Sequence, residues 1–156
     1  MLNRFHLIPV FSAVLTFTLF CTGTPASEGI VPPGSTPLSR VLKNVENRGI
    51  QPVRVGVDGR QWVIDGVSKK SSVRIWVNSS NGGIMKKEEI DEIEPIKSSL
   101  KMSTVVRKIE QANPGPIYRV HFAKDRWIIE TRRGKTTTMM ELSSKTGELL
   151  MGKDEP

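Results

Sequence analysis

Few residues of this 156-residue chain could carry acid–base or nucleophilic chemistry, because it contains two histidines and one cysteine. A serine or cysteine nucleophile needs a base within hydrogen-bonding reach. Cys21 and the first histidine lie in an N-terminal segment that we expect to be removed, which leaves His121. His121 alternates with Val120 and Phe122, so its side chain should face away from the apolar side of a strand. We therefore expect His121 to be a solvent-facing residue and not a general base.

Other chemistry-bearing patterns are also weak. Paired carboxylates could serve glycoside hydrolysis, but Asp65 and Glu130 occupy equivalent places in two similar segments and resemble surface strand residues. A single histidine without cysteine does not make a zinc site, and the sequence holds no P-loop, dinucleotide fingerprint or calcium loop. We expect no catalytic residue, no metal site and no cofactor, and therefore no enzymatic activity.

The elements that position these residues occur twice. A shift of 65 residues places Trp62 of GRQWVIDG on Trp127 of KDRWIIET, and the match extends without a gap from position 53 to position 86. Under this shift the segment SSNGGIM corresponds to SSKTGELL, and apolar residues recur at every second position in both copies. That period is typical of half-buried strands.

Each copy is predicted to begin with a helix and continue with three antiparallel strands. Helix spacing appears in Leu38, Val41, Leu42 and Val45, with Thr36 or Ser39 as N-cap, and in Val105, Val106, Ile109 and Ala112 behind Ser103. The predicted strands are 53–57, 61–67 and 72–78, then 118–122, 126–132 and 137–143, and each third strand is followed by a glycine turn and a short return run, GIM or ELL. The fold class is α+β, with two tandem units, each of one helix packed on a three-stranded antiparallel sheet.

The N-terminal segment has the features of a signal peptide. Arg4 provides a positive charge, an apolar stretch runs from Leu7 to Cys21, and Thr24-Pro25-Ala26 is a small-x-small cleavage site. Phe20 before Cys21 is too bulky for a lipoprotein signal, so an ordinary signal peptide is favoured over a lipid anchor, and no membrane span would remain after cleavage. We expect an exported protein, periplasmic or extracellular. The predicted parts are a signal peptide (1–26), a flexible lead-in (27–36), unit 1 (37–87), a linker (88–101), unit 2 (102–151) and a tail (152–156).

The net charge of +7 permits binding to anionic partners. The positive residues are spread along the chain and form no basic arm, and export argues against nucleic acid as a partner. Binding to an anionic polymer or membrane surface remains the alternative function.

The phrase GRQWVIDGVSKKSSVRIWVNSSNGGIM and the closing turn Ser143-Ser144-Lys145-Thr146-Gly147-Glu148-Leu149 resemble the PepSY domain family. That family's closing turn begins with an acidic residue, where this chain has Ser143, and the first copy of the turn is degenerate. The resemblance covers about residues 37 to 151. It implies an exported, non-catalytic helix-on-sheet module that inhibits or regulates a protease, and it implies no catalytic residue.

Trp76 is the residue that the repeat does not explain. Trp62 and Trp127 fall on the inward stripe as core anchors, whereas Trp76 alternates with inward residues and corresponds to Glu141 in the second copy. Its outward neighbours by the same alternation are Arg54, Val63 and Arg74, the last of which corresponds to Met139. A tryptophan–arginine surface has the composition of protein interfaces. The alternative is that the second unit covers Trp76.

We therefore expect an exported tandem PepSY-type module that binds a protein partner, such as an envelope protease, through Trp76, Arg74, Arg54 and Val63. The roles of inhibitor, escort and sensor stay open at this stage, as do the oligomeric state and whether the two units share one sheet.

Overall fold

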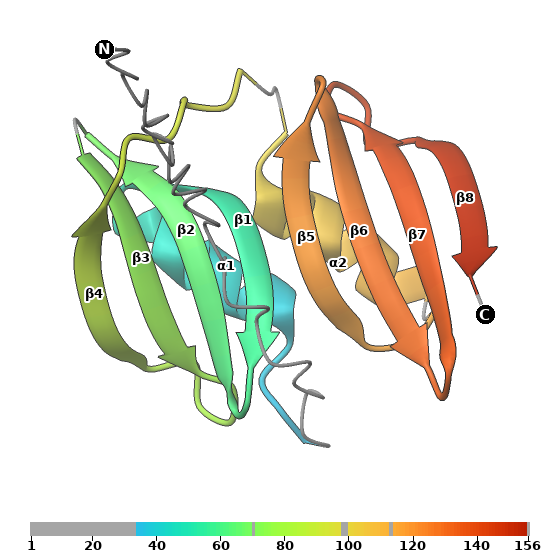
Figure 1. Ribbon diagram of the computed structural model, residues 1–156, viewed down its shortest axis with the longest axis horizontal. Coiled ribbons are helices and arrows are strands. Elements are labelled where there is room, and N and C mark those ends of the chain that lie inside the picture. Colours follow the sequence, from blue (N-terminus) through green and yellow to red (C-terminus); the bar gives the residue numbers. More distant parts are fainter. Residues whose placement is uncertain (1–33, 70, 98–99, 113, 156) are drawn as a thin grey trace, which may run out of the picture.

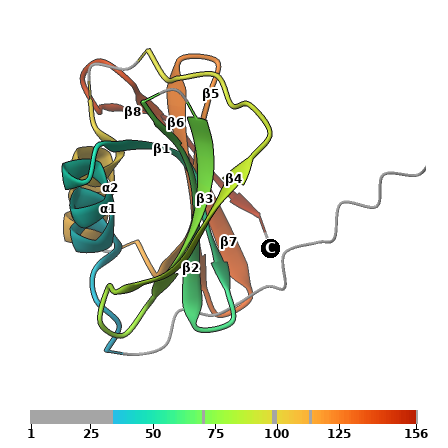
Figure 2. The same cartoon turned by 90° about the vertical axis from the view of Figure 1, so that its left-hand side faces the viewer.

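Two helices lie on one face of a single eight-stranded antiparallel sheet (Figures 1 and 2). The computed structural model describes residues 34–155 except 70, 98–99 and 113, and describes the backbone alone at 153–155. The strand order is β4-β3-β2-β1-β5-β6-β7-β8. The elements are α1 (Leu38–Asn47), β1 (Ile50–Asp58), β2 (Gln61–Ser68), β3 (Ser71–Asn78), β4 (Ile84–Ile90), α2 (Met102–Ala112), β5 (Ile117–Ala123), β6 (Arg126–Arg133), β7 (Thr136–Ser143) and β8 (Leu149–Glu155).

The α+β class and the two helix-plus-sheet units agree with the sequence prediction, but each unit has four strands where three were predicted. The last two residues of the return runs GIM and ELL begin β4 and β8, which follow turns at Gly82 (φ +70°) and Gly147 (φ +68°). The charged run of β4 lacks apolar alternation because an edge strand has one neighbour and is widely exposed. As a result, the predicted linker loses its first three residues, 88–90, to β4.

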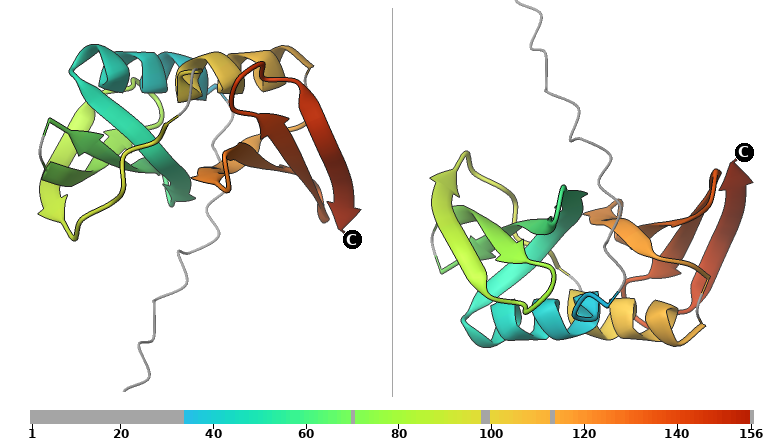
Figure 3. Two further views of the ribbon diagram at one scale, coloured as in Figure 1. Left: turned by 90° about the horizontal axis from the view of Figure 1, so that it is seen from above. Right: turned by 90° about the horizontal axis from the view of Figure 1, so that it is seen from below.

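The two units share one continuous sheet, a point that the sequence left open. β1 pairs with β5 through Arg54↔His121, Val55↔Val120 and Gly56↔Arg119. When each residue is replaced by its counterpart 65 positions away in the other unit, the pair Arg54↔His121 becomes Arg119↔Gly56. The central pair, Val55↔Val120, becomes itself. The units are therefore related by an approximate two-fold axis that passes between β1 and β5, and β4 and β8 form the two outer edges (Figure 3).

The helices cap one another across the same axis, and the predicted N-caps are wrong. α1 begins after Pro37, which has no side-chain cap, and the Thr36 hydroxyl donates to the carbonyl of Ser80. Instead, the Ser39 N–H donates to the carboxylate of Glu110 in α2. Ser103, inside α2, donates its N–H (3.0 Å) and its hydroxyl to the carboxylate of Glu46 in α1. The helices are thus antiparallel neighbours, and each N-terminus is satisfied by the other unit.

The core lies between the helices and the sheet. Trp62 and Trp127 are 2% and 1% exposed, as expected for core anchors, and they pack with the inward residues of the strands. All of the predicted helix positions are buried except Ala112, which is exposed at the end of α2.

The described linker residues between β4 and α2 form no helix, and hydrogen bonds anchor them to unit 1. Gln51 donates its side-chain amide to the Ile96 carbonyl at 2.9 Å and accepts the Ile96 N–H at 3.2 Å. The Ile93 N–H donates to the Ser72 hydroxyl at 2.7 Å. Ile96 is buried, so this connection packs against unit 1.

The predicted signal peptide (1–26), Cys21 and most of the lead-in lie outside the described residues. Within residues 34–155, apart from the gaps given above, no helix has the length and apolar character needed to cross a membrane.

Candidate protein-binding face

The face of the sheet opposite the helices carries most of the residues that the sequence singled out. We call it the open face, since neither helix covers it (Figure 2). Strand pairing arranges its side chains in transverse rows. The tryptophan row contains Lys86, Trp76, Val63, Gly56, Arg119, Glu130 and Met139, and the arginine row contains Glu88, Arg74, Asp65, Arg54, His121, Ile128, Glu141 and Met151.

Trp76, Val63, Arg74 and Arg54 therefore lie together, in two adjacent rows on β1, β2 and β3. Trp76 is half-buried, and its neighbours in the row are Val63 on β2 and Lys86 on β4. The second unit does not cover it, because the units join edge to edge and not face to face. Placement on one open surface is what an interface requires.

Lys86 holds the indole of Trp76 in place. The Lys86 ammonium nitrogen lies 4.4 Å from the centroid of the Trp76 ring, within the range of a cation–π contact. The same ammonium forms an ion pair with Glu88 at 2.7 Å. The indole is thus partly ordered before any partner binds, so less side-chain conformational entropy is lost on binding.

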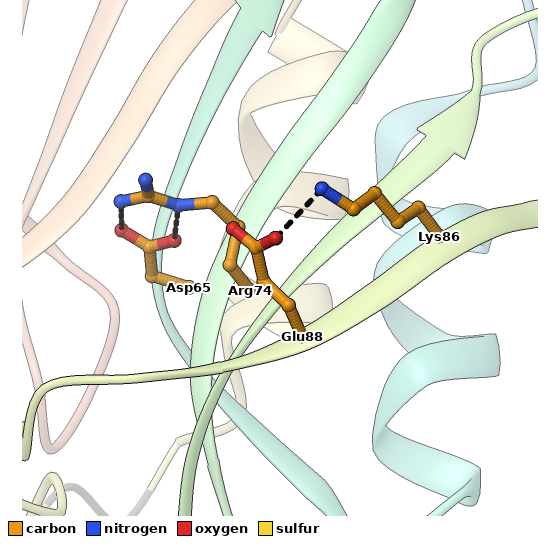
Figure 4. A network of polar contacts seen from close by, with 4 residues as sticks. All are labelled: Asp65, Arg74, Lys86 and Glu88. Carbon is orange, nitrogen blue, oxygen red and sulfur yellow. Dashed lines mark hydrogen bonds and ion pairs between the residues drawn. The ribbon is translucent and has the colours of Figure 1, made fainter.

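Arg74 and Asp65 form a two-pronged ion pair (Figure 4). The guanidinium donates to the two carboxylate oxygens at 2.7 and 3.0 Å. The hydrogen bond to Asp65 raises the pKa of Arg74, against the opposing effect of desolvation. Asp65 was predicted to be a surface residue, but it is 5% exposed, because Arg74 covers it on the open face.

Arg54 differs from the other cations of this surface. Asp65 lies directly opposite Arg54 in the β1–β2 pair. However, both carboxylate oxygens of Asp65 accept hydrogen bonds from Arg74. On its other side Arg54 faces His121. Among the described residues, no ion pair or side-chain hydrogen bond is formed by the exposed Arg54 guanidinium.

The second unit uses the equivalent positions differently. Glu141, at the position of Trp76, accepts from Arg126 at 2.6 Å, and Arg126 stands where unit 1 has Gln61. Arg119, the counterpart of Arg54, contacts Glu130 at 3.4 Å. The counterpart of Arg74 is the apolar Met139. On the open face, unit 2 thus has ion pairs at the positions where unit 1 has Trp76 and Arg54.

His121 lies on the open face, as alternation predicted, but alternation alone could not predict that it faces Arg54. Burial lowers the pKa of His121; Glu130 opposes this change, and Arg54 and Arg119 add to it. A half-buried neutral imidazole beside two guanidinium groups can accept or donate one hydrogen bond to a ligand. Within the described ranges no cluster of three or more metal-ligating side chains is found.

A hollow of about 390 Å³ lies where the two units meet, between the end of α1, the start of α2 and the linker, and Trp127 of unit 2 also lines it. Two of its polar side chains already have partners, since Glu46 caps α2 and Gln51 binds the Ile96 backbone. It is therefore a weaker candidate than the open face.

No family model matches the chain, and no curated protein matches it. The chain is similar to solved structures, three of which follow. A candidate lipoprotein of Clostridium difficile 630 shares 12% identity over 80% of this chain and 96% of its own, with a TM-score of 0.45. A BLIP-like protein of Bacteroides fragilis NCTC 9343 shares 18% identity over 81% and 89%, with a TM-score of 0.31. A candidate periplasmic protein of Bacteroides eggerthii DSM 20697 shares 14% identity over 81% and 90%, with a TM-score of 0.28. These likenesses are too loose to place the chain in a family or to assign it an activity.

Proposed function

We propose that this chain is an exported, non-catalytic module that binds a protein partner through the open face, with Trp76, Val63, Arg74 and Arg54 at the contact. The observation that carries the proposal is the half-buried Trp76 on a sheet face that neither α1 nor α2 covers. Tryptophan and arginine dominate the binding energy of protein interfaces when they lie close together in one patch. The resemblance to the PepSY family adds the finer part of the proposal, namely that the partner is an envelope protease that the module inhibits or regulates.

The absence of a catalytic role is part of this proposal. His121 has a guanidinium group opposite it and no serine, threonine or cysteine paired with it in the neighbouring strands. Asp65, Glu130 and Glu141 on this face are engaged by arginines, and Glu88 is engaged by Lys86. This arrangement favours recognition of another surface over activation of a nucleophile.

A capture experiment tests the proposal. The chain from residue 27 onward is immobilised and exposed to envelope extract of the source organism, and the bound proteins are identified after cross-linking. Trp76→Ala should weaken capture of the specific partner by about thirtyfold, the loss expected for an interface tryptophan worth about 2 kcal/mol. Leu150→Ala is the matched control, because Leu150 is 52% exposed but lies on the β8 edge, away from Trp76. Equal capture by the Trp76→Ala variant and the wild type would refute the proposal.

Protease activity measured with the captured partner separates the finer roles. Inhibition by the wild-type chain that is lost in the Trp76→Ala variant supports a regulatory role. Full protease activity in the complex would exclude inhibition.

A further inference from the structure

The positive charge of Arg54 is left unmatched at the centre of the open face, where β1 and β5 meet. Arg54 on β1 and Arg119 on β5 are related by the two-fold axis. Arg54 lies directly across from His121, and Arg119 lies two residues before His121 on the same strand. Glu130 contacts Arg119 at 3.4 Å, a long distance for an ion pair. The acid nearest to Arg54, Asp65, is held by Arg74.

A gap lies between these cations. Gly56 is directly opposite Arg119 on β5 and Val63 on β2, and a Cβ atom built at position 56 would meet nothing within 4 Å. Side chains that face each other across an antiparallel pair stand about 4.5–5.5 Å apart. The missing side chain therefore leaves a hollow about one residue wide, bordered along β1 by Arg54. Asp58 lies at its far end and already interacts with another group.

We propose that this hollow over Gly56 receives the carboxylate of an acidic residue from an extended segment of the partner protein. The inference rests on the proposed binding function and adds the chemistry of the partner. Arg54 and Arg119 would donate to the carboxylate, because planar guanidinium groups match the geometry of its two oxygens. An acidic side chain would also neutralise the charge that the sheet leaves unmatched, whereas a basic or apolar side chain would bury it without compensation.

The distance to Trp76 sets the spacing within the partner segment. Gly56, Val63 and Trp76 are neighbours in one row, so Gly56 and Trp76 are separated by two strand spacings, about 10 Å. Residues i and i+3 of a polyproline II segment point to the same side and lie about 9 Å apart. In a flat strand, residues on the same side are about 7 or 13 Å apart, which fits less well. The expected motif is an acidic residue with an apolar residue three positions away.

Peptide selection tests this inference without knowledge of the natural partner. Random twelve-residue peptides are displayed and selected on the chain from residue 27 onward, and the dissociation constants of the selected peptides are measured for four proteins: wild type, Arg54→Gln, Gly56→Val and Trp76→Ala. Selected peptides should be enriched in Asp or Glu with an apolar residue three positions away. Arg54→Gln should weaken their binding about tenfold to a hundredfold.

The Gly56→Val variant separates loss of binding from loss of folding. The position has no positive φ and has open space above it, and valine favours strands, so the variant should melt at or above the wild-type temperature. Its side chain would nevertheless fill the hollow and abolish peptide binding.

The outcomes distinguish the two proposals. Peptides that need Trp76 but lack acidic residues, or that bind the Arg54→Gln and Gly56→Val variants as tightly as the wild type, would overturn the carboxylate hollow and leave the binding face intact. Selected peptides that are indifferent to Trp76→Ala would overturn the face itself. Vesicles of phosphatidylserine that bind the wild type and Gly56→Val equally, with no peptide selected, would show a charged surface without a hollow and would also overturn the inference.

Discussion

Glu46 should stabilise the junction between the two units, and its replacement by alanine is the most informative stability test that the structure offers. The carboxylate accepts two hydrogen bonds at the N-terminus of α2, one from the N–H and one from the hydroxyl of Ser103. Loss of an N-cap costs about 1 kcal/mol, and loss of an acidic charge at a helix N-terminus costs a further 0.3–1 kcal/mol or so. Glu46→Ala should therefore lower the free energy of unfolding by about 1–2 kcal/mol.

The two-fold axis supplies a matched control. Glu110 performs the same task at α1, but through a single hydrogen bond of 3.2 Å from the Ser39 N–H. Glu110→Ala should cost less, about 0.5–1 kcal/mol. The two caps lie at opposite ends of the helix pair, so the double variant should lose roughly the sum of the two. Equilibrium urea unfolding followed by tryptophan fluorescence measures all three values. A loss below about 0.3 kcal/mol for Glu46→Ala, or a larger loss for Glu110→Ala, would refute the capping argument.

Three further predictions concern the sheet. Gly66→Ala should cost about 1–3 kcal/mol in urea unfolding, because its Cβ would lie 2.6 Å from a backbone carbonyl oxygen of β1, whereas Gly56→Ala, with open space, should cost nothing measurable. The single imidazole signal of the chain from residue 27, followed by proton NMR, should give His121 a pKa below the usual 6.5, and Arg54→Gln should raise that pKa. Because the folded-state pKa is lowered, the contribution of His121 to stability is complete above about pH 6.5 and declines as the pH falls toward the folded-state value; an unshifted or raised pKa would contradict this. Leu150→Lys should reduce any self-association seen in sedimentation velocity without loss of stability, since Leu150 is 52% exposed in the apolar run Leu149-Leu150-Met151 of an edge strand, and association that is unchanged would exclude that edge as the cause.

The sequence was sufficient for features that depend on periodicity. The helices, the first three strands of each unit and the burial of Trp62 and Trp127 follow from apolar spacing and from the repeat. Alternation also placed Trp76 and Arg54 on the same side of the sheet. Each of these features is set by residues close together in the chain.

Features that depend on contacts between the units could not be predicted in this way. The N-cap residues were misassigned because Glu46 and Glu110 come from the opposite unit, 57 and 71 residues from their partners. The position of His121 opposite Arg54 depends on which strand edges meet. The burial of Asp65 depends on Arg74, whose counterpart in unit 2 is a methionine, so the repeat gave no hint of the ion pair. The fourth strands were predicted only as the short return runs GIM and ELL, because the charged residues that follow in β4 and β8 carry no apolar alternation.

The two-fold relation between the units has a consequence for binding stoichiometry. Pairing of β1 with β5 and reciprocal capping of the helices form an arrangement that two identical chains, each one unit long, would adopt as a dimer. Such a dimer would present every surface residue twice and would offer two equal docking positions. When the units are joined in one polypeptide, equivalent positions can hold different residues, as with Trp76 and Glu141. The fused chain can therefore match a partner that itself has no symmetry and hold it at a ratio of one to one.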